Sequence, residues 1–169
     1  EKISRDDYSA EELGKLREIV IDSALNDPAS LPKPIQNELY AKVEADNLFS
    51  EEDAAILAEK KNDKYLYNFL SKEAIAKLAE LAMANKDTYI SNKIFSGLVE
   101  GRISKQIKEN ALLEQTYVKA EDGKQSVAKY LESVNKDLKI TEFVRFEVGE
   151  GMEKKNEDFA AEVAAQMNA

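Results

Sequence analysis

The sequence contains neither cysteine nor histidine among its 169 residues. Without cysteine, the chain can form no disulfide and has no thiolate nucleophile. Without histidine, it lacks the commonest general base and the commonest ligand for transition metals. No run approaches the roughly 18 consecutive apolar residues that a membrane span needs, and no signal peptide is visible. These absences disfavour an enzyme, a bound metal or cofactor, and a membrane protein.

Positive charge is also scarce, because 24 lysines and arginines face 33 acidic residues and the net charge is −9. Phosphate backbones repel an acidic chain, so nucleic acid is not expected as a partner. A protein partner is favoured instead. Apolar residues make up 43% of the chain, which is enough for a packed core. The first residue is Glu1 rather than methionine, so we expect the parent protein to contain residues upstream.

Helical patterns dominate the first two-thirds of the chain. Ser9 and Glu12 form a capping-box pattern, and apolar residues then recur at helical spacing over residues 13–24. All three prolines lie within residues 28–34, which indicates a hinge or loop tip after this helix. Further helices are predicted around residues 35–43, from Ser50 to Lys60, after Ser71 and over roughly 90–110.

The last third of the chain is predicted to contain a helix and a strand. Residues 127–134 have helical spacing. Residues 140–148 are typical of a strand, because apolar side chains alternate there with Arg145 and Glu147. A strand alone is unstable, so it needs a partner. That partner is the nearby segment 112–119, sequence outside these residues, or a second copy of the chain.

The C-terminal tail from Glu153 onward is predicted to be helical, since Phe159, Val163 and Met167 follow i, i+4 spacing. An isolated helix of ~13 residues is marginal in water. The tail therefore needs a surface on which these side chains are buried. That surface belongs either to this chain or to a partner protein.

The acidic and glycine-rich clusters indicate no catalytic chemistry. The acidic run Glu51–Asp53 is explained by the favourable effect of negative charge at the start of a helix. It lacks the spacing of an EF-hand loop, and no acidic pair has the features of a glycosidase site. The segments Gly97–Gly101 and Gly149–Gly151 lack the Gly-Lys-Ser/Thr ending of a phosphate-binding loop. No catalytic residue, metal ligand or cofactor is therefore predicted.

Several motifs resemble one known family. Residues 143–155 and 158–166 closely resemble the C-terminus of elongation factor Ts. Upstream, Val99–Ile103 and Leu112–Val118 are similar to the family's Val-Glu-Gly-Arg and Leu-Leu-Glu-Gln-Pro-Phe-Val segments, in the same order. Thr116 stands where proline is usual in the family. The C-terminal runs are long enough for the resemblance to be specific.

The resemblance covers residues 1–25, where Ile3–Asp6 resembles the start of the family's helical arm, and residues 93–167. It is poor over about 30–90, where many members have only a short link and this chain is expected to carry an enlarged helical insertion. The implied fold is mainly α with a small β component (α+β). Its expected regions are residues 1–110 as an antiparallel helical hairpin or arm of dimerisation type with the insertion, 111–152 as a remnant of the C-terminal core subdomain with the strand 140–148, and 153–169 as a C-terminal helical module.

The resemblance implies a role in translation elongation. The family binds elongation factor Tu, in its GDP-bound and nucleotide-free forms, and accelerates GDP dissociation without covalent chemistry. The family's release motif, Thr-Asp-Phe-Val, is absent from these residues. We therefore expect a cytoplasmic bacterial protein, or one of organellar origin, that contributes binding of elongation factor Tu rather than GDP release. By the matched motifs, the expected contact residues are Phe159, Glu162, Val163, Gln166, Arg145, Glu147, Glu150 and Met152.

A second hypothesis stays open, in which the chain is a helical interaction or dimerisation module without exchange activity. The apolar seam Leu13–Ala24 and the unpaired strand favour this hypothesis. A homodimer through the helical arm is one form that such a module could take. The mass of the chain in solution, measured at several concentrations, discriminates between the two hypotheses.

Overall fold

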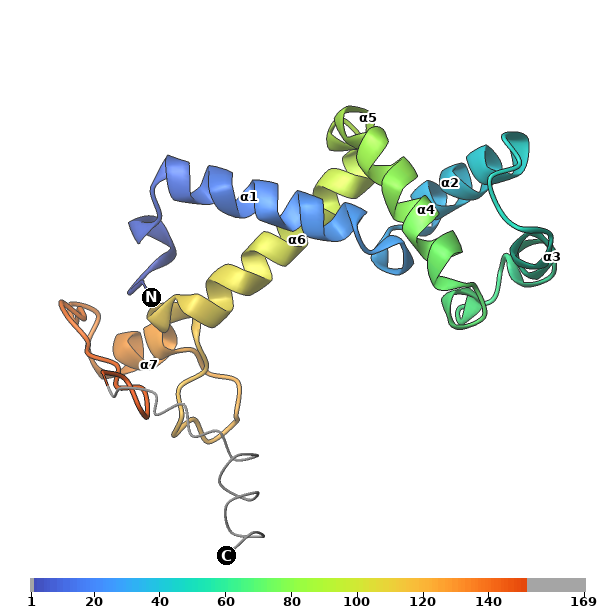
Figure 1. Ribbon diagram of the computed structural model, residues 1–169. Helices are drawn as coiled ribbons and strands as arrows, with labels where there is room; N and C mark the ends of the chain where they lie inside the picture. The colour runs from blue at the N-terminus through green and yellow to red at the C-terminus, as the bar shows by residue number, and fades with distance from the viewer. Residues whose placement is uncertain (1, 152–169) are drawn as a thin grey trace, which may run out of the picture. The chain divides into compact units, whose positions relative to one another are not determined.

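A computed structural model describes residues 2–151 as a mainly helical chain (Figure 1), which confirms the mainly α class expected from the sequence. The chain divides into two units, one ending at Lys139 and the other beginning at Ile140. The described helices are α1 (Ala10–Leu25), α2 (Lys33–Ala45), α3 (Glu51–Lys60), α4 (Lys72–Ala84), α5 (Lys86–Ile90), α6 (Lys93–Asn110) and α7 (Val127–Val134). Short 3-10 turns are η1 (Arg5–Asp7), η2 (Pro28–Ser30), η3 (Leu66–Asn68) and η4 (Leu112–Glu114).

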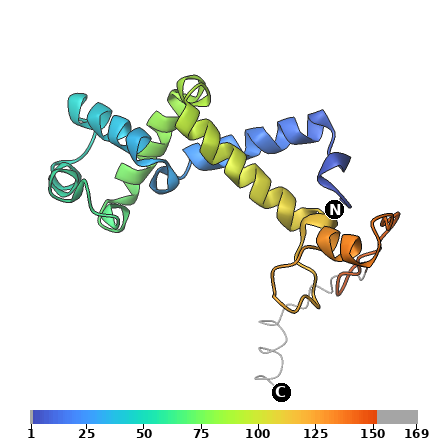
Figure 2. The same cartoon turned by 180° about the vertical axis from the view of Figure 1, so that it is seen from behind.

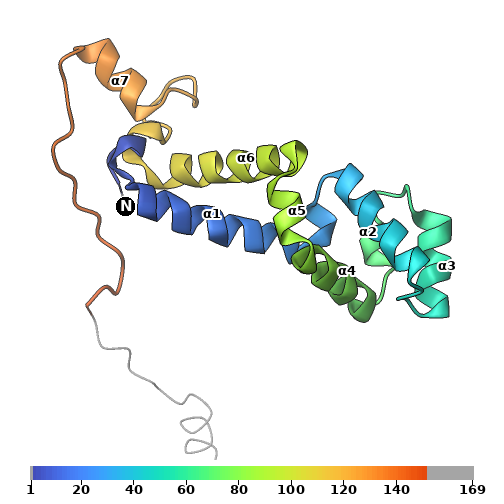
Figure 3. The ribbon, with the colours of Figure 1, turned by 90° about the horizontal axis from the view of Figure 1, so that it is seen from above.

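Helices α1 and α6 lie side by side and run antiparallel (Figures 1 and 3). Ahead of α1, a parallel bridge joins Lys2 to Ala111, which directly follows α6. The Lys2 carbonyl also accepts a hydrogen bond from the Leu112 amide at 3.0 Å. Farther along, Arg17 of α1 forms an ion pair with Glu100 of α6. The antiparallel helical hairpin that the sequence predicts is therefore present.

The start of α1 follows directly from its sequence. Ser9 Oγ accepts a hydrogen bond from the Glu12 amide at 3.1 Å, and the Glu12 carboxylate accepts one from the Ser9 amide at 2.8 Å. This reciprocal pair is the predicted capping box. Lys2 forms an ion pair with Glu12 at 2.7 Å, and the hydrogen bond from Lys2 is the main cause that lowers the pKa of Glu12 to about 2. The Glu12 carboxylate thus caps α1 and also binds Lys2, which precedes this helix.

Residues 26–92 form helices α2 to α5 at one end of the hairpin, as the view from behind also shows (Figure 2). The predicted proline-bounded segment 26–34 contains η2 and the start of α2. Helix α2 then begins at Lys33 with Pro34 in its first turn, where a missing amide hydrogen breaks no helical hydrogen bond. Lys86 of α5 binds both Glu18 and Asp22 of α1, at 2.9 and 2.7 Å. This paired contact joins α5 to the hairpin.

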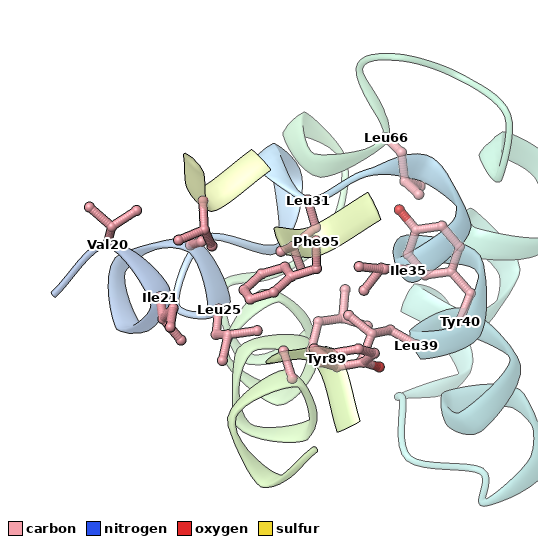
Figure 4. Close-up of a cluster of buried hydrophobic side chains, with 14 of the residues drawn as sticks. Val20, Ile21, Leu25, Leu31, Ile35, Leu39, Tyr40, Leu66, Tyr89 and Phe95 are labelled. Carbon is pink, nitrogen blue, oxygen red and sulfur yellow. The ribbon is translucent and has the colours of Figure 1, made fainter. Parts of the chain in front are cut away.

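An apolar core lies where the hairpin meets helices α2–α5 (Figure 4). Its largest fully buried members include Leu25 of α1, Ile35 and Leu39 of α2, Tyr89 of α5 and Phe95 of α6. The ring centroids of Tyr89 and Phe95 are 6.3 Å apart, within the range of a tilted aromatic contact. Burying one side chain of this size contributes about 1.5–3 kcal/mol. Because helices of both parts share this core, the hairpin and helices α2–α5 stabilise each other.

A buried polar network lies beside this core. Gln36 Nε2 donates to the carbonyls of residues 28 and 29 at 3.1 and 3.0 Å, and the Tyr40 hydroxyl donates to Gln36 Oε1 at 3.3 Å. The hydroxyl oxygens of Tyr40 and Tyr67 are 3.0 Å apart, and burial raises the pKa of both tyrosines. The Tyr89 hydroxyl, in contrast, is buried without a hydrogen-bond partner among the described residues. The two kinds of buried hydroxyl should therefore differ in their effect on stability.

Asp53 joins the N-termini of α3 and α4. Its carboxylate accepts hydrogen bonds from the Ser71 amide at 2.9 Å, the Ser71 hydroxyl at 2.7 Å and the Ser50 hydroxyl at 2.9 Å. Ser50 and Ser71 are the N-caps of the two helices, as the sequence predicts. Burial opposes the negative charge on Asp53, but the three hydrogen bonds outweigh it and lower the pKa below its ordinary value of 3.8.

Residues 111–139 complete the first unit with little burial. Tyr117 stacks on Tyr130 of α7, with ring centroids 4.0 Å apart, and Thr116 forms an antiparallel bridge with Ser126. The helix predicted over residues 127–134 is confirmed as α7. None of its residues is buried, so the apolar face of α7 lacks full cover within the described part of the chain.

The strand predicted over residues 140–148 does not form in the described part of the chain. The segment follows an extended path (Figure 3) but belongs to no β-ladder. In the first unit, the predicted local partner 112–119 is bridged to Ser126 instead. A strand needs a partner, so pairing of this segment with sequence outside these residues, or with a second copy of the chain, stays a prediction. Gly149 and Gly151 turn the chain at the predicted stop, with left-handed φ angles of 86° and 77°.

Phenylalanine replacements should separate the two kinds of buried tyrosine hydroxyl. Tyr40→Phe removes a hydroxyl that is hydrogen-bonded to Gln36 and Tyr67, so the free energy of unfolding should fall by about 1–2 kcal/mol. Tyr89→Phe removes a hydroxyl without a described partner, so the free energy of unfolding should stay constant or rise by up to about 1 kcal/mol. Urea denaturation followed by circular dichroism measures both. An equal loss in the two variants would contradict this distinction.

Asp53→Ala should lower the free energy of unfolding by about 2 kcal/mol at neutral pH, because donors at both N-caps lose their acceptor. The pKa of Asp53 is lowered in the folded state, so its contribution is full above pH 3.8 and is lost as the pH falls through the folded-state pKa. The difference in stability between the wild-type chain and the variant should therefore close in acid. Asp46→Ala, at an exposed carboxylate, is the matched control. A difference that is the same at every pH would contradict the assignment.

Candidate protein-binding surfaces

Most of the residues predicted to contact a partner lie outside the described part of the chain. These residues are Met152, Phe159, Glu162, Val163 and Gln166. Their roles stay predictions. The other three, Arg145, Glu147 and Glu150, belong to the second unit and are exposed. They are the part of the predicted contact surface whose geometry can be described.

A turn brings Glu147 and Glu150 together. The Glu150 amide donates to the Glu147 carbonyl at 3.1 Å, and the Glu147 amide donates to Glu150 Oε2 at 3.4 Å. Gly149 and Gly151 supply the left-handed backbone that other residues rarely adopt. Both carboxylates are exposed to water, so the turn suits ion pairing with a basic surface rather than proton transfer in a buried site.

Apolar side chains are exposed at alternate positions just before this turn. Val144, Phe146 and Val148 are 69%, 89% and 104% exposed. Side chains two residues apart in an extended backbone lie on the same side. The three therefore form a narrow apolar edge, called here the 144–148 strip, next to the charged residues Arg145 and Glu147. Exposed apolar groups that gather in this way mark contact sites for other chains.

A polar cleft near α7 was not predicted from the sequence. Its volume is about 590 Å³. Its lining includes the stacked pair Tyr117 and Tyr130 and the three lysines Lys119, Lys124 and Lys129. The sequence gives little signal for this cleft, because the tyrosines meet only when the loop between Thr116 and Ser126 closes. Within that loop, the Asp122 carboxylate accepts from the amides of residues 124 and 125, and these bonds lower its pKa.

The apolar seam of α1 is used within the chain. Val20 and Ala24 are buried, and Leu13 and Leu16 pack against the same core with part of their surface exposed. Ile19 points away from the core and is 64% exposed. The seam therefore forms the inner face of the hairpin. A homodimer through the arm stays a prediction, and the seam that suggested it is already occupied.

The described residues show no constellation that is suited to catalysis. Among them, no group of three or more acidic side chains is placed to hold a metal ion. In the same part of the chain, no helix is both long and apolar enough to cross a membrane. The acidic run at the start of α3 acts in capping, since Asp53 binds both N-cap serines. The class of protein that these features define is a helical, acidic protein with exposed surfaces suited to protein contacts.

The comparison with known families identifies this class more closely. The family model described as Elongation factor TS matches residues 2–150. The match includes the hairpin, helices α2–α5, α7 and the acidic turn as far as Glu150. The chain therefore belongs to the elongation factor Ts family, as its motifs predict.

Curated relatives agree with this assignment. Elongation factor Ts of Paracidovorax citrulli is 44% identical over 100 residues, which are 59% of this chain and 32% of that protein. The proteins of the same name from Clostridioides difficile and Clostridium tetani are 50% and 51% identical, and each match covers 44% of this chain and 25% of the relative. The chain thus spans about a quarter to a third of the length of these relatives. No solved structure matches it.

Proposed function

We propose that this chain is part of a guanine-nucleotide exchange factor for elongation factor Tu, and that it contributes binding of elongation factor Tu rather than GDP release. The observation that carries the proposal is the family match over residues 2–150. The relatives are named as elongation factor Ts, and such a factor would act in the bacterial cytoplasm. The proposed reaction is a change in nucleotide affinity without covalent chemistry.

Burial along the chain supports a role in binding. No described residue after Ala111 is buried, although this part contains α7, the stacked tyrosines and the 144–148 strip. Apolar side chains that have no core within their own chain gain stability when a partner covers them. A C-terminal part of this kind is suited to fold more firmly on a partner surface. Elongation factor Tu is the partner that the family assignment favours.

The proposed contacts combine apolar anchors with polar neighbours. Phe159 and Val163 would supply buried apolar area, because large side chains carry most of the energy of a protein interface. Glu162 and Gln166 would hydrogen-bond around them. The exposed residues before the tail would align it, and their proposed members are Arg145, Glu147, Glu150 and Met152.

Binding alone does not release a nucleotide. A factor weakens GDP binding only if it binds the nucleotide-free state of elongation factor Tu more tightly than the GDP state. A segment with equal affinity for both states shifts nothing, however tightly it binds. These 169 residues contain no Thr-Asp-Phe-Val motif. The near match Thr141–Val144 reads Thr-Glu-Phe-Val and overlaps the run that resembles the C-terminus of the family. We therefore assign the chain to affinity and not to release.

Stopped-flow release of a fluorescent GDP from elongation factor Tu tests the absence of release activity. The 169-residue chain should leave the rate of release unchanged at saturating concentration. The isolated elongation factor Tu supplies the baseline rate, and a full-length elongation factor Ts supplies the positive control. Acceleration by the chain close to that of the full-length factor would contradict the proposal.

Phe159→Ala should weaken binding of elongation factor Tu by roughly tenfold or more, because it removes the largest proposed anchor. Isothermal titration calorimetry with GDP-bound elongation factor Tu measures this change. Val118→Ala is the matched control, since Val118 is an apolar residue that is 97% exposed and outside the proposed contact. Equal affinities of the two variants would show that the tail is not part of the binding surface.

A second candidate function is a protein-interaction module formed by the inserted helices. Tyr65 and Phe69 are 53% and 49% exposed, and lysine ammonium groups lie over both rings. The distances are 4.5 Å from Lys64 Nζ to the Tyr65 ring centroid and 4.8 Å from Lys60 Nζ to the Phe69 ring centroid. Exposed aromatic side chains of this kind favour contacts with another protein. Association of the chain that Phe69→Ser abolishes would support this function.

A further inference from the structure

Two pairs of tyrosine side chains interact within the described residues, and their geometries differ. The hydroxyl oxygens of Tyr40 and Tyr67 are 3.0 Å apart, and the Tyr40 side chain is fully buried. Tyr117 and Tyr130, in contrast, stack with ring centroids 4.0 Å apart and an angle of 15° between the ring planes. No other tyrosine in the described part of the chain stacks on a second tyrosine.

The backbone on both sides of the stack holds the two rings together. The Tyr117 amide donates to the Gln125 carbonyl at 2.8 Å, and the Val127 amide donates to the Gln115 carbonyl at 2.9 Å. These bonds close the loop that separates the two tyrosines in sequence. A side-chain hydrogen bond with Tyr130 also raises the pKa of Tyr117, so the Tyr117 phenol keeps its proton at neutral pH.

Small solutes can reach the stacked rings. Both tyrosines are half-buried and line the polar cleft of about 590 Å³ near α7. A water molecule occupies only ~30 Å³ of liquid volume, so the cleft has room for water and for a small oxidant. The chain contains neither cysteine nor tryptophan, which are the side chains that commonly compete with tyrosine for oxidants. Methionine takes up an oxygen atom instead, and the product is a sulfoxide of different mass.

A stacked pair of phenols is arranged for radical coupling. A phenol that loses one electron and one proton becomes a radical, and its unpaired electron occupies π orbitals on the oxygen and on the carbons ortho to it. These orbitals point out of the ring plane, toward the ring stacked on it. Carbon atoms in contact are ~3.5–4.0 Å apart, so the π systems of Tyr117 and Tyr130 already touch. Holding reacting atoms in this way favours their reaction over encounters in solution.

We propose that Tyr117 and Tyr130 form an oxidative modification site, at which a peroxide joins the two rings as a dityrosine. Each phenol gives up one electron and one proton, and a carbon–carbon bond forms between the carbons ortho to the two hydroxyls. The hydrogens on these two carbons then move to the oxygens, which restores both aromatic rings. The peroxide O–O bond breaks and takes up the two electrons and two protons, so hydrogen peroxide leaves as two water molecules.

The new bond ties together a part of the chain that has no core of its own. No described residue after Ala111 is buried, and α7 is held to the preceding segment by local contacts. A cross-link between Tyr117 and Tyr130 closes this loop covalently, and such a link restricts the unfolded conformations of the segment. The site goes beyond the proposed function, because the reaction needs no elongation factor Tu.

Peptide mapping of the oxidised chain tests the site. The 169-residue chain is oxidised with persulfate, itself a peroxide, and a light-activated ruthenium complex, and the monomer is then isolated and digested with trypsin. Cleavage after lysine places Tyr117 in peptide 109–119 and Tyr130 in peptide 130–136. The oxidised chain should yield these two peptides joined, with a mass two hydrogens below their sum. Tyr117→Phe and Tyr130→Phe should each abolish this product. Tyr65→Phe, at a phenol that is 53% exposed and outside the stack, is the matched control and should leave the yield unchanged.

Unfolding separates the effect of the stack from ordinary reactivity. In concentrated urea the yield of the joined peptides should fall roughly tenfold or more, because the rings are no longer held together. Absence of the joined peptides from the folded chain overturns the proposal, as does an equal yield in urea. A link between Tyr40 and Tyr67 in equal yield also overturns it, because hydroxyl contact would then suffice without a stack. Each measurement is made without elongation factor Tu, so failure of this proposal is separate from failure of the proposed function.

Discussion

The core shared by the hairpin and helices α2–α5 is the contact on which the first unit depends. All the buried residues of α1 lie in its second half, from Val20 to Leu25, next to these helices. The first half of α1 is held by the Glu12 capping box, by the Lys2–Glu12 pair and by partial packing of its leucines. The ion pair of Arg17 with Glu100 joins α1 to α6, and the ion pair of Lys86 with Glu18 joins α1 to α5. Without helices α2–α5, the buried end of the hairpin would face water.

The C-terminal part of the chain is held by local contacts rather than by a buried core. Beyond Ala111 the described residues have no buried side chain, so their order depends on caps, turns and the Tyr117–Tyr130 stack. These local interactions fix a conformation but provide little burial, and each contributes only about 1 kcal/mol. The buried core thus ends with Ala111, and the residues that follow expose apolar side chains. This difference supports the proposal that the C-terminal part contacts another protein.

Local signals explain what the sequence predicted well. The N-caps at Ser9, Ser50 and Ser71 each form with the expected geometry, because a cap depends on residues only three positions apart. The family motifs identified the chain as a member of the elongation factor Ts family. No strand forms at 140–148 within the described residues, and its pairing stays a prediction, since a strand depends on a partner that its own sequence does not specify. The Asp53 link between two caps and the tyrosine stack were missed for a related reason, because each joins residues 13 or more positions apart.

The central claim is that this chain adds affinity for elongation factor Tu without coupling to its nucleotide. Titration calorimetry of the 169-residue chain with GDP-bound and with nucleotide-free elongation factor Tu tests this most directly. By linkage, any preference for the nucleotide-free form equals the factor by which the chain weakens GDP binding. The account predicts the same affinity for both forms. A preference of roughly tenfold or more for the nucleotide-free form would contradict it.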